Sequence, residues 1–264
     1  MKLPIVLLIL VCLILGCKED EIAPKTVTLD YYEESFEIPG LDFQPQNKTV
    51  YEYDDEGRLT SYTFFSFDPN LNAMVEQRRF LFSYLDDRVD KIEGFLTNST
   101  SPYIKYSYQY DDVRVKKITE KNYGAGVDSE ASFSYPSANI VNVSYQFSNG
   151  GSFDYEMNVE GNNVLKDKTT RGAQLCSNGE YTYDQHPNPF ASLGYIDYSL
   201  TNVSANNKLT EDVNYVACAF PNLKPELYEY EYNSDGYPKE SIATYESSDE
   251  HAPKSTKRFF YKLK

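Results

Sequence analysis

The stretch "VYEYDDEGRLTSYTFF", residues 50–65, joins two aromatic runs through an acidic segment that ends at Gly57. Apolar and polar residues alternate in both runs, which is the period of a strand with one buried face. Asp and Gly between such runs favour a tight turn, because Gly adopts positive φ and Asp bonds to nearby backbone. These residues therefore predict a β-hairpin.

The same pattern returns four times along the chain. It reads "FLFSYLDDRVDKI" from Phe80, "YSYQYDDVRVKKI" from Tyr106, "EYTYDQHPNPF" from Glu180 and "YEYEYNSDGYPKESI" from Tyr228. The composition, 25 Tyr and 15 Phe with no Trp, is typical of strands, and no helical period is sustained. The sequence predicts an all-β fold with little helix, an antiparallel meander of repeated hairpins.

Each hairpin carries a turn motif that starts at a Tyr. Intervals between these anchors are mostly about 20 to 30 residues, the range of a repeat array whose units share one core. We interpret the anchors as structural turn motifs. They are Tyr53, Asp54 and Gly57, then Tyr110 and Asp111, then Tyr183 and Asp184, and last Tyr232, Asn233 and Gly236.

The first and last motifs, "YEYDDEGRLTSY" and "YEYNSDGYPKES", resemble the YD repeats of RHS-type bacterial proteins, Tyr-x-Tyr-Asp-x-x-Gly-Arg-Leu. The chain looks closer still to YD-like β-repeat lipoproteins of Bacteroidota, in which "YDQHPNPFASL" from Tyr183 is also a familiar line. The resemblance covers about residues 50 to 245. It implies a curved sheet of hairpins, half-barrel or elongated, and we expect a single hairpin-repeat domain over residues 47–264.

The N-terminus has the features of an exported lipoprotein. Lys2 precedes a short apolar run, and Gly16-Cys17 ends it, so we expect a signal peptide over residues 1–16 and lipidation of Cys17. An ordinary cleaved signal is the alternative. Lys18-Glu19-Asp20-Glu21 resembles the surface-export signal of Bacteroidota lipoproteins, although a charged tether would look the same. Residues 17–46 are interpreted as lipidated N-terminus and tether.

Charge limits the partners. The formal charge is −15, and loss of residues 1–16 with Lys2 makes it −16, so binding to nucleic acid or to anionic lipid headgroups is not expected.

Histidine is scarce, whereas carboxylates are abundant. The two histidines, His186 and His251, lie in polar loop segments, and neither belongs to a zinc-binding pattern. The paired acids fall where hairpins turn. We therefore predict no enzyme activity, no metal site and no cofactor.

Two cysteines remain beyond the anchor, Cys176 and Cys218. Export to an oxidising compartment permits a disulfide between them, and two buried free thiols are the alternative.

Two functions remain open. The first is a non-enzymatic, surface-exposed lipoprotein of the outer membrane that binds an extracellular glycan or another polymer through Tyr side chains. The second is a structural or interaction protein, an accessory subunit of an outer-membrane transporter or an adhesin, which would use long sheet edges for contacts. Membrane attachment through the N-terminal lipid is expected in both.

Overall fold

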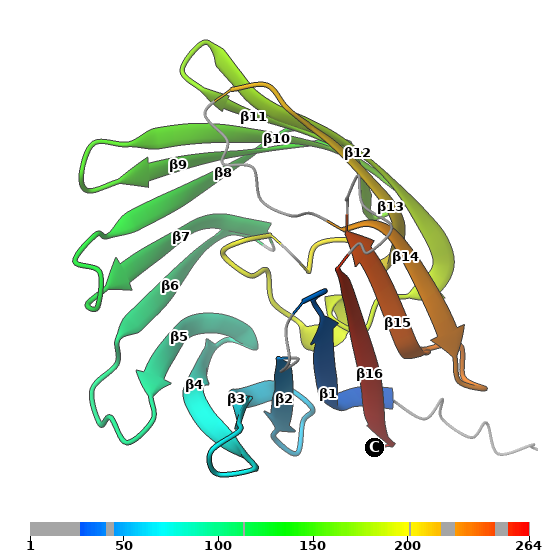
Figure 1. Cartoon of the computed structure of the whole chain (residues 1–264). Helices are drawn as coiled ribbons and strands as arrows, with labels where there is room; N and C mark the ends of the chain where they lie inside the picture. Colours follow the sequence, from blue (N-terminus) through cyan, green and yellow to red (C-terminus); the bar gives the residue numbers. More distant parts are fainter. Residues whose placement is uncertain are drawn as a thin grey trace, which may run out of the picture.

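The computed structural model describes residues 27–40, 45–112, 114–200, 202–217, 225–245 and 253–263. Figure 1 shows their strands arranged around a central space. The first eight strands are β1 Val27–Glu37, β2 Gln46–Tyr53, β3 Leu59–Asp68, β4 Ala73–Leu85, β5 Arg88–Leu96, β6 Ile104–Asp111, β7 Arg114–Asn122 and β8 Ser129–Ser137. The others are β9 Ile140–Phe147, β10 Ser152–Glu160, β11 Asn163–Arg171, β12 Gln174–Pro187, β13 Asn206–Tyr215, β14 Pro225–Tyr232, β15 Pro238–Tyr245 and β16 Lys254–Leu263. One 3₁₀ turn, η1 Ala191–Leu193, lies between β12 and β13.

The strands form a closed barrel of sixteen strands in chain order, with β1 paired to β16. Every pairing is antiparallel, as the alternation of residues predicts. The expected half-barrel or elongated sheet is wrong, because Val27 to Glu37 pairs with Leu263 to Lys254 and closes the ring. The long sheet edges expected for partner contacts are therefore absent among the described strands, since each has a neighbour on both sides.

The barrel begins earlier than the predicted boundary at residue 47. Strand β1 was expected to belong to the tether, yet it hydrogen-bonds with β2 as well as with β16. Alternation is weak in β1, where Tyr31 and Tyr32 are adjacent and a β-bulge shifts the register between Leu29 and Tyr31. A bulge of this kind hides the two-residue period from sequence reading.

Aromatic and aliphatic side chains fill the inside of the barrel. In β10 the residues Tyr155 and Met157 face inward, whereas Asp154 and Glu156 are exposed on the outer face. A belt of buried residues at the starts of strands lies near one end of the barrel. They are Leu29, Leu59, Val89, Val115, Val164 and Pro238.

The Tyr anchors join each hairpin to the one before it. Tyr84 donates its hydroxyl to the carbonyl of Leu59 at 2.8 Å, and the Arg58 guanidinium lies over the Tyr84 ring at 5.2 Å. Tyr110 repeats this with Val89 and Arg88, at 2.9 and 5.1 Å. The Gly-Arg-Leu part of the motif is thereby explained: the Arg covers the next ring, and the residue after it is buried and accepts the hydroxyl.

Tyr135 makes the same pair of contacts, to the carbonyl of Val115 at 2.7 Å and under Arg114 at 5.0 Å. Tyr53, Tyr183 and Tyr261 also donate to strand-start carbonyls, those of Leu29, Val164 and Pro238. Through these contacts each Tyr joins one hairpin to the strand that precedes it.

Register shifts recur beside the anchors, between Ser83 and Tyr84 and between Gln109 and Tyr110. Others lie at Tyr53, Tyr183 and Tyr232. A bulge increases the local twist of a strand pair, and bulges repeated around a sheet bend it towards closure. The anchors that signal a repeat in the sequence thus also supply curvature.

Strands β13 and β14 are joined by little backbone pairing. Between the described residues of β13 and β14 the register holds a single pair, Thr210 with Leu227. Side chains reinforce it, since the Tyr230 hydroxyl donates to the carbonyl of Lys208 at 3.0 Å and the Tyr228 hydroxyl to Glu211 at 3.3 Å.

Candidate functional site

A segment of the chain occupies part of the barrel interior. Residues 188–200 and 202–205, here called the plug, lie between β12 and β13 and include η1; in Figure 1 they form the yellow segment inside the ring of strands. The plug contains Leu193, which is 5% exposed, and Phe190, whose ring lies edge-on to Tyr32 at 5.5 Å between centroids. An interior plug of this kind obstructs an open channel along the barrel.

Polar contacts hold the plug to strands β6, β8 and β9 of the wall. Tyr108 of β6 donates to the carbonyl of Ile196 at 2.9 Å, and Tyr145 of β9 to the carbonyl of Tyr198 at 2.9 Å. The Tyr198 hydroxyl donates in turn to Ser129 of β8 at 2.7 Å. Backbone groups of an irregular segment inside a barrel need such partners, because bulk water does not surround them.

Asn202 fixes the shape of the plug itself. It is 6% exposed, donates to the carbonyl of Tyr195 at 2.7 Å and accepts the backbone N–H of Asp197 at 3.0 Å. The plug is therefore a shaped part of the interior surface.

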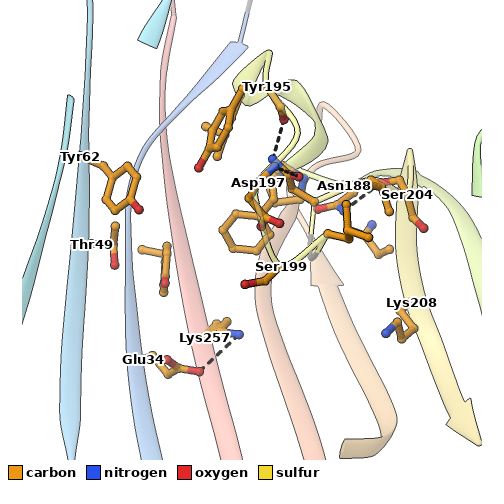
Figure 2. Close-up of a pocket in the computed structure, with 18 of the residues that line it drawn as sticks. Glu34, Thr49, Tyr62, Asn188, Tyr195, Asp197, Ser199, Ser204, Lys208 and Lys257 are labelled. Carbon is orange, nitrogen blue, oxygen red and sulfur yellow. Dashed lines mark hydrogen bonds and ion pairs between the residues drawn. The ribbon is translucent and has the colours of Figure 1, made fainter. Parts of the chain in front are cut away.

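Between the plug and the wall lies a cavity of about 1040 Å³, which we call the lumen cavity. Its lining is dominated by aromatic rings from the wall, with Tyr195 and Phe190 contributed by the plug. Figure 2 shows Tyr62 and Thr49 on one side of this space and Tyr195 and Asp197 on the other. The volume is that of a site for a small molecule or for a few units of a polymer.

An ion pair faces the cavity from β1 and β16. Lys257 lies 3.3 Å from Glu34, and Ser255 donates to the same carboxylate at 2.9 Å. Burial opposes the charged ammonium, but Glu34 outweighs it, so the pKa of Lys257 lies above its ordinary value. The Glu34 side chain is 14% exposed and that of Lys257 is 34% exposed, so the lysine is the partner that a ligand in the lumen would meet.

A second ion pair faces the cavity from β13. Lys208 lies 2.9 Å from Glu211, and its ammonium group sits 4.4 Å above the Tyr181 ring. Tyr181 and Tyr155 both donate to Asp167, and burial followed by the carboxylate raises the pKa of each phenol. Both lysines of the lumen are therefore paired with carboxylates of the wall.

The outer face of the barrel is polar. Cross-strand ion pairs join Glu33 to Lys48, Glu93 to Lys105, Glu130 to Lys117, Glu180 to Lys166 and Glu240 to Arg258. These pairs are spread over β1–β2, β5–β6, β7–β8, β11–β12 and β15–β16. Ion pairs of this kind are not typical of the apolar outer band of a barrel that spans a bilayer.

The predicted turn residues lie at hairpin ends, away from the lumen cavity, except Tyr183, which also lines it. Asp54 accepts the backbone N–H of Arg58 at 2.8 Å, and contacts with that Arg outweigh burial and lower the pKa of the carboxyl. Gly57 has φ +91°, a conformation that L side chains rarely adopt.

The other predicted turn motifs also lie at the ends of hairpins, where their side chains bond to nearby groups. Asn233 accepts backbone N–H groups of Asp235 and Tyr237 at 3.0 Å, and Gly236 has φ +81°. Asp111 ends β6 opposite Arg114. Asp184 accepts the N–H of His186 and the hydroxyl of Tyr232.

His186 stacks on Tyr232 with 3.9 Å between ring centroids, and its Nδ1 lies 3.0 Å from the carbonyl of Gly236. It thereby connects two hairpin ends. Within the described part of the chain, no group of three or more His, Cys, Asp and Glu side chains is arranged to hold a metal ion.

Cys176 on β12 is buried and disulfide-bonded. Cys218 lies outside the described residues, so its pairing with Cys176 stays a prediction. The signal peptide, Cys17, Lys18 to Glu21 and His251 also lie outside them. No helix in the described ranges is long and apolar enough to cross a membrane.

Sequence reasoning missed the charged residues that line the lumen. Glu34 falls in the stretch interpreted as tether, and Lys257 lies on β16, where no inward charge was predicted. The signal that could have found them is a charge on the inward side of each alternation, at positions two residues from Tyr32 and Phe259.

No protein-family model and no curated protein matches the chain. Among solved structures, a porin-like protein from Bacteroides uniformis is similar over 91% of this chain and 99% of its own, with 14% identity and a TM-score of 0.59. A porin-like protein from Bacteroides vulgatus is similar over 90% and 99%, with 12% identity and a TM-score of 0.54. The fold is shared with these porin-like proteins. At this identity the likeness extends to the fold alone.

Proposed function

We propose that the protein is a non-enzymatic, lipid-anchored binding protein of the outer-membrane surface, and that its barrel lumen holds an extracellular glycan. The observation that carries the proposal is the lumen cavity of about 1040 Å³, walled by Tyr and Phe rings and bounded by the plug. Aromatic rings with polar groups between them are the surface on which sugar rings pack, and an obstructed barrel suits retention of a ligand better than its passage.

The polar outer face supports attachment by a lipid rather than by the strands. Ion pairs such as Glu93 with Lys105 and Glu180 with Lys166 would be costly in hydrocarbon. A lipid on Cys17 would hold such a barrel at the membrane while leaving its wall in water. Expression with radiolabelled palmitate should label the wild-type chain and not Cys17→Ala, and protease added to intact cells should degrade the labelled protein if it faces outward.

Binding can be tested with the soluble form that starts at Lys18. The chain has no Trp, so Phe64→Trp, on the cavity wall, places a single Trp beside the proposed ligand, and its emission can be excited selectively at wavelengths that Tyr does not absorb. Titration with a panel of oligosaccharides should change its emission, while Phe65→Trp, the next residue on the same strand, should respond less. A panel that changes neither emission would refute glycan binding. Recovery of an outer-membrane protein at equal amount after crosslinking on intact cells would favour the accessory-subunit function instead.

A further inference from the structure

The lumen cavity contains phenol groups that the fold does not use. Among the described residues no hydrogen bond engages the hydroxyls of Tyr51, Tyr62 and Tyr195, in contrast to those of Tyr84, Tyr108 and Tyr145. Tyr51 is only 6% exposed, yet its hydroxyl is not sealed from the cavity that it lines. A buried phenol without a partner is unfavourable unless water or a ligand bonds to it.

These three phenols lie close together. The rings of Tyr51 and Tyr62 are 6.0 Å apart between centroids, and Tyr62 and Tyr195 both contact Phe82, at 6.0 and 5.0 Å. Two come from neighbouring wall strands, β2 and β3, and the third comes from the plug. Figure 2 shows the Tyr195 ring extending from the plug towards the wall that carries Tyr62 and Thr49. We call Thr49, Tyr51, Tyr62 and Tyr195 the hydroxyl cluster.

The chemistry of the cluster selects the class of ligand. Each hydroxyl both donates and accepts, so the cluster matches a molecule with many hydroxyl groups of its own. Burial raises the pKa of Tyr51, Tyr62 and Tyr195, which keeps all three phenols neutral at physiological pH. A hydrocarbon ligand would leave the hydroxyls unpaired, which is unfavourable in a buried site.

Charge near the cluster is already balanced. The carboxylates of Glu34, Asp197 and Glu211 and the cationic groups of Arg78, Lys208 and Lys257 all line the cavity, so the formal charge of its lining is zero. Glu34, which lies on the strand beside Thr49 and Asn47, is paired with Lys257. A carboxylated or sulfated sugar would bring an anion that this lining does not offset. The balance favours an uncharged sugar.

From this geometry we infer that the hydroxyl cluster is a binding subsite for one uncharged pyranose ring of the glycan, formed jointly by wall strands β2 and β3 and the plug. The inference rests on the proposed function, because it names the ligand class of the same lumen. The plug residue Tyr195 completes the subsite, so the plug acts as part of the binding surface.

The test compares hydroxyl deletions that keep the ring. Tyr62→Phe and Tyr195→Phe are made in the soluble Phe64→Trp form, with Tyr123→Phe, in an exposed loop, as the matched control. Each is titrated with neutral oligosaccharides (glucose, mannose, galactose and xylose series) and with uronic acid and sulfated oligosaccharides. We expect neutral sugars to bind, and each lumen variant to lose about 3- to 10-fold in affinity while the control is unchanged. Thermal unfolding of each variant checks that the barrel is intact.

The outcomes separate the two proposals. Neutral binding that is equal in all three variants, or binding of anionic sugars only, overturns the hydroxyl cluster while glycan binding in the lumen stands. Binding of neither class overturns both. If the lumen variants unfold, the milder Thr49→Val, which removes a single hydroxyl, replaces them and must show a loss in the same range.

Discussion

The Tyr anchors offer a direct measure of what the repeat contributes to stability. In the triple variant Tyr84→Phe, Tyr110→Phe and Tyr135→Phe, each ring stays beneath its Arg, and only the hydroxyl that reaches the previous hairpin is lost. The three lost hydrogen bonds measure 2.7 to 2.9 Å. A net hydrogen bond contributes about 1 kcal/mol, and the three acceptors differ, so the free energy of unfolding should fall by about 3 kcal/mol.

For a chain of this size, 1 kcal/mol changes the melting temperature by about 2 to 4 °C, which predicts a decrease of about 6 to 12 °C. Calorimetry of the soluble form gives the melting temperature, and urea unfolding should show a lower midpoint with an unchanged slope. Tyr123→Phe, whose side chain is 58% exposed, is the control and should change little. A triple variant that melts with the control would refute the role assigned to the anchors.

Three further results are expected. Leu59→Ala, at a residue 1% exposed, should lower the free energy of unfolding by about 2 to 5 kcal/mol in urea, whereas Leu71→Ala, 66% exposed, should change it little; equal effects would contradict the buried belt. Burial raises the pKa of Glu120, and a raised carboxyl pKa gives stability at low pH that is lost as pH rises. Glu120→Gln should therefore melt higher than wild type at pH 7, with the gain shrinking near pH 4, and a gain constant over this range would exclude titration as its cause. The form starting at Lys18, unfolded without reductant, should show no free thiol and then two after reduction; two thiols before reduction would refute the pairing of Cys176 with Cys218.

The strands were predictable because a sheet with one apolar face leaves a two-residue period in the sequence. In β9, Val143 and Tyr145 are buried whereas the residues between and after them are less so, as alternation requires. The hairpin turns were predictable for a related reason, since Asp and Gly at fixed offsets have few other uses.

Closure was not predictable from the same pattern. Alternation says which face of a strand is buried and does not say which strand lies beside it. The pair Val27 with Leu263 joins the two ends of the described chain, and the bulges that bend the sheet towards this meeting interrupt the period instead of adding to it.

The charged residues of the lumen were missed because charged side chains were expected on the outer, solvent-facing side of each strand. Glu34 and Lys257 are tolerated on the inward side through their mutual contact, and a contact between residues so far apart along the chain leaves no local trace. The plug was missed because the stretch that leads into it, "YDQHPNPF" from Tyr183, has the composition of an ordinary turn. The position of the plug inside the barrel depends instead on Tyr108 and Tyr145, which lie on distant strands.

The single ladder pair between β13 and β14 has a consequence for how the molecule assembles. The barrel can enclose the plug only if the wall stays open until the plug has entered. The plug directly precedes β13. The junction with the least backbone bonding is the natural place for the final step, after the plug has bonded to β6 and β9. We expect β14 to exchange its amide protons faster than β9 and β10, and the barrel to part along this line before it unfolds as a whole.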